Sequence, residues 1–374
     1  MVSIAKVAAA PLPAPKWTGI YEATTRNVIC PQGPLIKDMT KDKLHFISSE
    51  DCLNINIYVP DNEEKNLPVV VYVHGGAFQV GFGEFISHTP LVNTGKVVVV
   101  NFNYRVGAHG FLCLGTENVP GNAGMKDQIA ALRWVKDNIG KFHGNPNDVT
   151  LAGYSAGSVA VDLLMLSKSA QGLFNKVIPE SGSSLSVWSI QSDPIETAKE
   201  VALSLNFTNV DDLAALEHFY ISTSLDIILN DMFMEHSVYL YQYSYYDETL
   251  PAIHEYKGAS HCAQSFALVE VNDITSTVLP TSNSKEYETV QNSLVDIWIN
   301  FITTGKPMQE NSSSPKHWPV ASLEKFAYMD LNVELKLKYD LLKERVQFWD
   351  SIYNNYYRQP IPPKIRKVQA KTEL

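Results

Sequence analysis

Short runs of apolar, β-branched and aromatic residues recur along the chain and are separated by polar turns. The run "VVVV" at 97–100 is continuously apolar, which is typical of a strand that is covered on both faces of a sheet. Runs of this kind favour strands, because branched and aromatic side chains pack well on a pleated surface. The predicted strands are 53–59, 68–73, 97–104, 149–152, 176–181 and 238–246.

Stretches with apolar residues at helical spacing lie between and after these runs. Strands that alternate with helices predict an α/β fold, with a mostly parallel sheet and helices on both faces. We expect residues 1–374 to form a single domain. The tail at 359–374 is expected to be disordered, because its Pro, Lys and Arg residues follow no apolar period. The predicted helices are 122–139, 156–168, 193–204, 286–304 and 339–357.

Composition changes this picture little. Of the 374 residues, 45% are hydrophobic and 19% are charged, which is ordinary for a globular protein with a sizeable core. The net charge of −10 argues against nucleic acid and anionic membrane surfaces as partners. No apolar run approaches the ~20 residues that a membrane span needs. The first 17 residues lack the sustained apolar core of a secretory signal, so the chain as given is expected to be cytosolic.

The stretch "VTLAGYSAGSVAVDLLML" (149–166) combines a predicted strand, a glycine-flanked serine and a predicted helix. Gly153-Tyr154-Ser155-Ala156-Gly157 matches G-x-S-x-G, the sharp turn on which a nucleophilic serine is exposed. Glycine is needed two residues away on each side because larger side chains would collide in so tight a turn. A serine at a helix N-terminus also lies next to backbone N–H groups that stabilise negative charge. The pattern therefore predicts a nucleophile, although a structural turn would match the same five letters.

A second glycine turn, His74-Gly75-Gly76-Ala77-Phe78, follows the predicted strand at 68–73 directly. Small residues at this place let the backbone approach a substrate carbonyl, and their N–H groups can point at an oxyanion. Taken alone, the turn could be structural. Its position upstream of the serine turn favours an oxyanion hole.

Longer segments extend both patterns, namely "SEDCLNINIYVP", "NYRVGAHGF", "GNAGMKDQIAALRWVKDNIGKFHGNPNDVTLAGYSAGS" and "GASH". With them the chain resembles the type-B carboxylesterase/cholinesterase family, and within it insect esterases of the antennal or juvenile-hormone-degrading kind. The resemblance covers about residues 17–190 and resumes from about 231 to the 350s. It implies the α/β-hydrolase fold and hydrolysis of a small-molecule carboxylic ester through a serine acyl-enzyme. Neither a metal nor a cofactor is implied, and members of the family are often secreted.

By position, the resemblance makes Ser155 the nucleophile and His261, in "GASH", the general base. The oxyanion hole would be formed by the N–H groups of Gly76, Ala77 and Ala156. The residue before the nucleophile is often glutamate in the family, so Tyr154 removes a charge near the site and is expected to tune substrate choice.

Cysteine and histidine usage adds two expectations. Cys30 and Cys52 flank a polar loop, and the resemblance pairs them in a disulfide, whereas Cys113 is expected to be a buried thiol. Among the other histidines, His74 and His109 are expected to be structural. The remaining ones are expected to be solvated: His45, His88, His143, His218, His236, His254 and His317.

The triad also needs a carboxylate, which in the family is a glutamate in an S-x-E-G-like turn. This chain contains no Glu-Gly dipeptide, and Ser155 and His261 are only 261 − 155 = 106 residues apart. The resemblance breaks near residues 221–233, which indicates an internal deletion that removes the acid and a late strand, and the N-terminus is short as well. The acid therefore stays unassigned. Carboxylates in the gap are expected to be solvated: Asp226, Asp231, Glu235, Asp247 and Glu248.

Three readings follow. The first is a serine hydrolase of small lipophilic esters, such as an acetate or a juvenile-hormone-like ester. The second is a non-catalytic or weakly active esterase-like binding protein, since loss of the triad acid costs ~10⁴ in turnover. The third is a deletion product that does not fold stably, because a missing internal strand leaves backbone groups unpaired. The intact serine turn and "GASH" favour the first.

Overall fold

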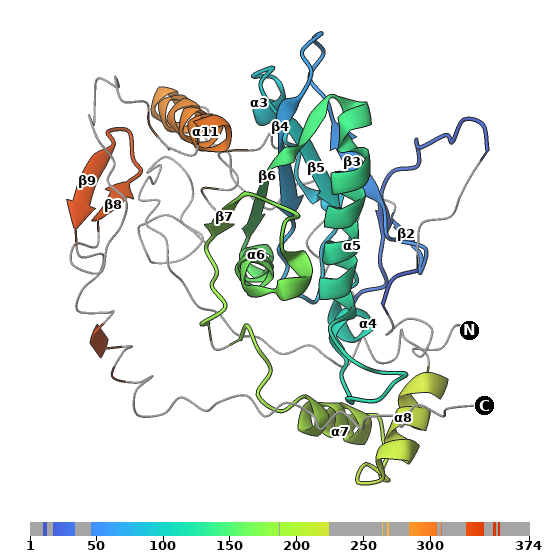
Figure 1. The fold of residues 1–374 in the computed structure, drawn as a ribbon. Coiled ribbons are helices and arrows are strands. Elements are labelled where there is room, and N and C mark those ends of the chain that lie inside the picture. Colours follow the sequence, from blue (N-terminus) through green and yellow to red (C-terminus); the bar gives the residue numbers. More distant parts are fainter. Residues whose placement is uncertain are drawn as a thin grey trace.

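The structure, a computed structural model, describes residues 10–12, 18–33, 46–186, 188–223, 264, 268, 284–304, 308, 327–339, 347–348 and 351. Its centre is a five-stranded sheet in the order β3-β5-β4-β6-β7 (Figure 1). The first pair is antiparallel and the other pairs are parallel, as the α/β prediction requires. The strands are β3 (Ile55–Tyr58), β4 (Leu67–Val73), β5 (Val98–Phe102), β6 (Gly144–Tyr154) and β7 (Lys176–Glu180).

The two central apolar strands are buried on both faces. All five residues of β5 are buried, and so are six of the seven residues of β4. Successive side chains of a strand point to opposite faces of a sheet, so a strand covered on both faces must be apolar at every position. The continuous valine runs of β4 and β5 meet this requirement, and both strands lie where the sequence predicts them.

Helices cover the two faces of this sheet (Figure 1). On one face, Val70 and Tyr72 of β4 pack with Trp298 of α11 (Lys285–Thr304) and with Leu91 of α3 (Thr89–Val92). We call this side the α11 face. On the other, the α6 face, Val71 of β4 packs with apolar residues of α5 (Ala123–Asn138) and α6 (Ala156–Leu166). Two apolar layers thus enclose the sheet, as the alternation of strands and helices predicts.

A third apolar cluster joins α7 (Pro194–Ser204) and α8 (Leu213–Ser222) to the segment around residues 108–119. The Asp212 carboxylate caps α8 by accepting the N–H groups of Ala214 and Ala215. The Asp193 carboxylate caps α7 by accepting the backbone N–H of Glu196. Further elements are β1 (Val28–Ile29), β2 (Ile47–Ser48), η1 (Gly83–Phe85), α4 (Gly107–Phe111), η2 (Ile139–Phe142), η3 (Lys168–Ala170), α7 (Pro194–Ser204), α8 (Leu213–Ser222), β8 (Ala327–Asp330) and β9 (Lys336–Tyr339).

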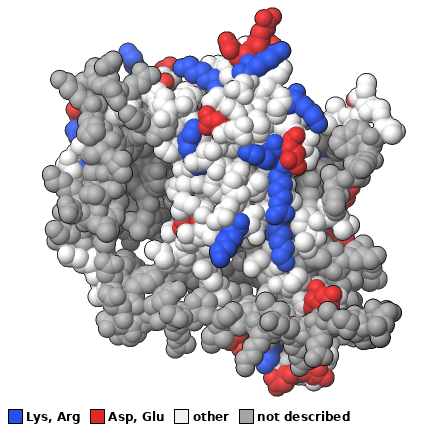
Figure 2. All heavy atoms as spheres, viewed as in Figure 1, with Lys and Arg blue, Asp and Glu red and all other residues white. Residues whose placement is uncertain are grey.

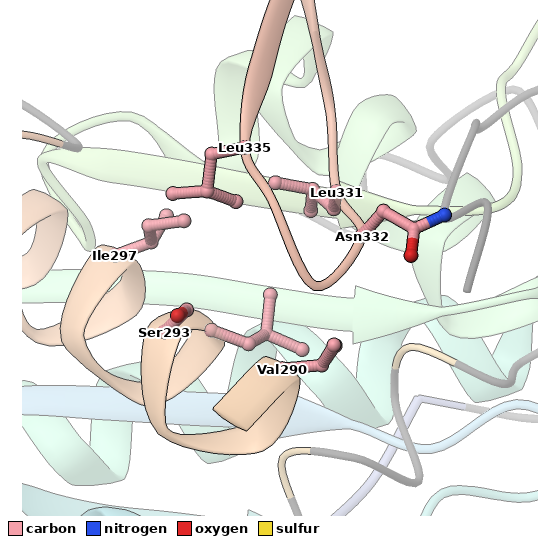
Figure 3. A pocket seen from close by; sticks show the side chains of 7 residues that line it. Val290, Ser293, Ile297, Leu331, Asn332 and Leu335 are labelled. Carbon is pink, nitrogen blue, oxygen red and sulfur yellow. The ribbon is translucent and has the colours of Figure 1, made fainter. Parts of the chain in front are cut away.

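A shallow apolar hollow lies between α11 and the turn that joins β8 to β9 (Figure 3). Ile297 of the helix faces Leu335 of the turn across it. None of its lining residues belongs to the serine turn or to the first glycine turn, and none carries a charge. The lining residues are Val290, Ser293, Leu294, Ile297, Leu331, Asn332 and Leu335.

Several predicted boundaries differ from the structure. β6 is longer than the predicted 149–152, because Gly144 already pairs with Leu67 and Tyr154 with Glu180. The prediction of a helix from 339 is wrong at its start, because Tyr339 ends strand β9. Helix α8 and the β8–β9 hairpin were not predicted. The predicted strand 238–246 and the tail 359–374 lie outside the described residues.

The solvent side of α5 carries the exposed Arg133 and Asp137, so this helix is amphipathic. Basic and acidic side chains occur together on the face of the molecule shown in Figure 2. Among the helices of the described residues, none has the length and apolar character that crossing a membrane requires.

Candidate active site

Ser155 occupies a strained turn between β6 and α6. Its backbone angles are φ 54° and ψ −122°, a conformation that side-chain-bearing residues rarely adopt. Such strain persists only where the surrounding structure enforces it, and it is concentrated at functional sites. The N–H of Ser155 donates to the carbonyl oxygen of Glu180 at 2.8 Å, and its own carbonyl accepts the N–H of Val159 at 3.1 Å. These two bonds anchor the serine between the next strand and the first turn of α6.

The two glycines of this turn have no room for a side chain. A Cβ added to Gly157 would lie 2.2 Å from the carbonyl oxygen of Val73, at the end of β4. A Cβ on Gly153 would lie 2.6 Å from the carbonyl oxygen of Gly157. The expected collision within the turn therefore holds for Gly153, whereas Gly157 must be glycine because strand β4 lies against it.

The first glycine turn packs directly against Ser155. A Cβ on Gly75 would lie 3.1 Å from Cβ of Ser155 and 2.8 Å from the carbonyl oxygen of Tyr154. After it the chain turns left-handed, with φ of 112° at Gly76, 55° at Ala77 and 61° at Phe78. The structure thus brings together the two turns that the sequence singles out.

The predicted oxyanion hole consists of three backbone N–H groups from the two turns. Within the described residues, no hydrogen bond uses the N–H of Gly76 or of Ala77. Ala156 is the first residue of α6, and the N–H of such a residue has no acceptor within its own helix. Ala77 is exposed and Gly76 is half-buried, so solvent and ligands reach this turn. An oxyanion hole requires backbone N–H groups that are not already used in hydrogen bonds.

The buried side chain of His74 supports the glycine turn. It is 2% exposed, and its ring stacks on Tyr104 with centroids 4.1 Å apart. The His74 Nδ1 lies 2.8 Å from the carbonyl oxygen of Gly75, and the Tyr104 hydroxyl donates to the carbonyl oxygen of His74 at 2.9 Å. Burial lowers the pKa of His74 to about 4, so the ring is neutral at pH 7. His74 is structural, as the sequence suggests.

A buried ion pair fixes the loop behind Phe78. Arg105 donates from Nε to Asp127 at 2.7 Å, and a second nitrogen lies 2.5 Å from the other carboxylate oxygen. This fork holds the start of α4, where the N–H of Gly107 donates to the carbonyl oxygen of Phe78 at 2.6 Å. The two-pronged pair is the geometry that arginine and carboxylate prefer. It connects α5 to the wall of the site.

The disulfide between Cys30 and Cys52 is confirmed. Next to it, Gln32 accepts the N–H of Gly81 at 2.8 Å and donates to the carbonyl oxygen of Gly81 at 3.1 Å. Gly81 in turn packs on the His74 ring, because a Cβ there would lie 2.4 Å from Nδ1. The bridged N-terminal segment therefore supports the glycine turn, a contact between distant residues that sequence patterns did not indicate.

Two expectations for single residues are wrong. His88 was expected to be solvated, but it is 1% exposed and packs edge-on against Tyr72 with centroids 4.6 Å apart. Its location at a turn suggested solvent, whereas the aromatic side chains of β3 and β4 enclose it. Cys113 was expected to be buried and is half-buried. His109 is buried, at 1% exposure, as expected for a structural residue.

Tyr154, the residue before the nucleophile, is directed into the core of the α11 face. It is 7% exposed and stacks on Tyr72 with centroids 6.1 Å apart. Next to it in the β6–β7 register is Glu180, a carboxylate that sequence analysis did not select. In the sequence, Glu180 resembles an ordinary solvated residue at the end of a strand. The only available signal was its place directly before Ser181 and Gly182, at the end of the strand that follows the serine turn.

The proposed base and the candidate acids lie outside the described residues. They are His261, Asp226, Asp231, Glu235, Asp247 and Glu248. Their roles remain predictions.

A strained serine after a parallel strand, glycines packed against it and a mixed sheet between helical layers define the α/β-hydrolase class. Solved structures have the same fold. Juvenile hormone esterase from Manduca sexta, with OTFP covalently attached, superposes with a TM-score of 0.77 at 20% identity, covering 94% of this chain and 93% of that chain. A thermophilic pNB esterase gives a TM-score of 0.73 at 23% identity, and the alignment covers 91% of this chain and 92% of that chain.

Sequence comparison identifies the family. The carboxylesterase family model matches residues 9–234 and 213–349, so this chain belongs to the carboxylesterase family. Human bile salt-activated lipase is 41% identical over 203 residues, which are 51% of this chain and 26% of that protein. Para-nitrobenzyl esterase of Bacillus subtilis (strain 168) is 40% identical over 208 residues, which are 54% of this chain and 42% of that protein. These alignments thus span less than half of either relative, and such partial coverage fits the internal deletion that the sequence indicates.

Proposed function

We propose that this protein hydrolyses carboxylic esters through an acyl-enzyme on Ser155. His261 is the general base, and the N–H groups of Gly76, Ala77 and Ala156 bind the oxyanion. The observation that carries the proposal is the strained backbone of Ser155, held against a glycine turn whose N–H groups are unused within the described residues. A turn without function would not need this strain.

The chemistry follows from these positions. Oγ of Ser155 attacks the ester carbonyl carbon while the imidazole of His261 takes the hydroxyl proton. The carbonyl oxygen becomes negative and is stabilised by the three N–H groups and by the N-terminus of α6. Collapse of this intermediate breaks the bond to the alcohol, which leaves with the proton from His261. Water then attacks the acyl-enzyme, with His261 again as base, and releases the carboxylic acid and free Ser155.

The proposed substrates are small lipophilic esters. Beside the oxyanion turn, the half-buried Phe78 packs edge-on against Phe111, with ring centroids 5.0 Å apart. This aromatic pair forms an apolar wall next to the N–H groups, where a non-polar acyl or alcohol group would be held. The names of two relatives, para-nitrobenzyl esterase and juvenile hormone esterase, also support an ester substrate with an apolar body.

Turnover of p-nitrophenyl acetate and p-nitrophenyl hexanoate tests the proposal. The wild-type protein should hydrolyse both, and Ser155→Ala should lower the rate by about a thousandfold or more. His261→Gln should lower it to a similar extent. Ser204→Ala, at the exposed end of α7, is the matched control and should retain the wild-type rate. Equal rates for wild type and Ser155→Ala would contradict the proposal.

A further inference from the structure

The backbone of Ser155 is in contact with the chain at the end of strand β7. The N–H of Ser155 donates to the carbonyl oxygen of Glu180, the last residue of that strand, at 2.8 Å. Two residues further on, a Cβ on Gly182 would lie 2.4 Å from the carbonyl oxygen of Ser155. The segment 180–182 therefore touches both polar backbone groups of the serine. The strained conformation of Ser155 persists only while contacts of this kind enforce it.

The sheet fixes only the first residue of this segment. The pairing of β7 with β6 ends at Tyr154 and Glu180, so Gly182 lies beyond the ladder of strand hydrogen bonds. Ser181, between them, has φ of 58°, in the left-handed region that residues other than glycine rarely adopt. The position of Gly182 against Ser155 must therefore be set by contacts outside the sheet.

Helix α6, which packs beside β7, supplies these contacts through two side chains (Figure 1). The hydroxyl of the buried Ser158 donates to the carbonyl oxygen of Gly182 at 2.7 Å. The Asp162 carboxylate accepts the N–H of Ser184 at 2.8 Å and the hydroxyl of Ser183 at 3.3 Å. Residues four apart lie on the same side of a helix, so Ser158 and Asp162 reach the same segment.

We propose that Ser158 and Asp162 are positioning residues of the hydrolytic site. They hold the segment 180–184 against α6, and this segment holds the backbone of Ser155 in its strained conformation. Asp162 acts as a hydrogen-bond acceptor, and its charge is not required. The proposal rests on the proposed function, because it supposes that Ser155 is the nucleophile.

Removal of either side chain should affect the reaction more than substrate binding. Neither residue is part of the predicted oxyanion hole or of the aromatic pair beside it, so KM for p-nitrophenyl acetate should change little. A small displacement of the attacking oxygen slows the chemical step strongly, so kcat should fall by roughly tenfold to a hundredfold in Ser158→Ala and in Asp162→Ala. The rate constant for labelling of Ser155 by a fluorophosphonate should fall in parallel.

Asp162→Asn separates the hydrogen bonds from the charge. The asparagine side chain keeps an oxygen that can accept the N–H of Ser184 and the hydroxyl of Ser183, but it is neutral. The kcat of Asp162→Asn should therefore stay close to the wild-type value, whereas that of Asp162→Ala falls.

Asp193→Ala is the matched control. Asp193 also accepts a backbone N–H, that of Glu196, but it does so at the start of α7. This variant should lower the urea midpoint, because a helix cap is lost, and leave kcat unchanged. Rates are expressed per active site, titrated to completion with the fluorophosphonate, so that a loss of folded protein does not count as a loss of kcat.

Two results would overturn the proposal. One is a wild-type kcat per active site in both Ser158→Ala and Asp162→Ala, and the other is an equal loss of kcat in Asp162→Asn and Asp162→Ala. If Asp162→Ala does not fold, the kcat of Ser158→Ala decides. Failure of the proposed function is a different result, since wild-type protein would then be no faster than Ser155→Ala.

Discussion

Gly157 and Val73 are in such close contact that a Cβ on Gly157 would lie 2.2 Å from the carbonyl oxygen of Val73. This contact joins the first turn of α6 to the end of β4. It holds the serine turn and the glycine turn against each other, and the proposed chemistry depends on that arrangement.

Gly157→Ala should therefore displace either α6 or β4. We expect a loss of about 1–3 kcal/mol in the free energy of unfolding, together with loss of esterase activity. Urea denaturation and p-nitrophenyl acetate turnover measure the two effects. Gly140→Ala is the control, because a Cβ on Gly140 meets nothing within 4 Å. Equal stability of the two variants would show that the contact is not as tight as described.

The Arg105–Asp127 pair should be essential for stability. Both side chains are buried, with 6% and 1% exposed. Asp127→Asn leaves the guanidinium charge buried without its counter-ion, so the free energy of unfolding should fall by about 3–5 kcal/mol. Asp211→Asn breaks the exposed pair with Lys199 and should cost less than about 1 kcal/mol. Urea titrations of both variants give the comparison.

His88 should make the protein less stable in acid. Burial lowers its pKa from 6.5 to about 3 in the folded state. Below pH 6.5 the unfolded chain therefore binds a proton that the folded protein does not, and stability falls as the pH falls towards 3. At pH 5 the loss is about 2 kcal/mol. His88→Phe should remove it, whereas replacement of the exposed His218 by Asn should not. Identical pH dependence of urea midpoints in wild type and His88→Phe would contradict this account.

The Cys30–Cys52 bridge closes a loop with a sequence separation of 22. Its removal in Cys30→Ser/Cys52→Ser should lower the free energy of unfolding by about 3 kcal/mol, because the unfolded chain regains that loop entropy. Through Gln32 and Gly81, the glycine turn should also become looser and esterase activity should fall. Cys113→Ser is the control, since this thiol is free. A denaturation midpoint unchanged by reduction would argue against the bridge.

Local patterns identified most of the central fold. Strands β4 and β5 were predictable because both of their faces are buried, which leaves a continuous apolar run. The N-terminal half of β6, "GNPND", is polar and contains Pro146, so its pairing with the start of β4 follows from the tertiary structure and not from pattern. Helix α8 does carry a local signal, because Asp212 stands as a capping residue directly ahead of an apolar stretch.

The site was predictable in the same uneven way. Ser155 and the glycine turn carry short motifs, so both can be recognised from residues that lie next to one another in the chain. Glu180 carries no motif, and its burial depends on Tyr72, 108 residues away in the chain. From one sequence, a solvated glutamate at the end of a strand cannot be distinguished from a buried one.

The central claim is that Ser155 is an activated nucleophile. Mass spectrometry of the intact protein and of its peptides, after incubation with a fluorophosphonate, tests it most directly. We predict one adduct, located on Ser155, that forms in the wild-type protein and is absent from Ser155→Ala. A cooperatively folded wild-type protein that acquires no adduct at Ser155 would contradict the account.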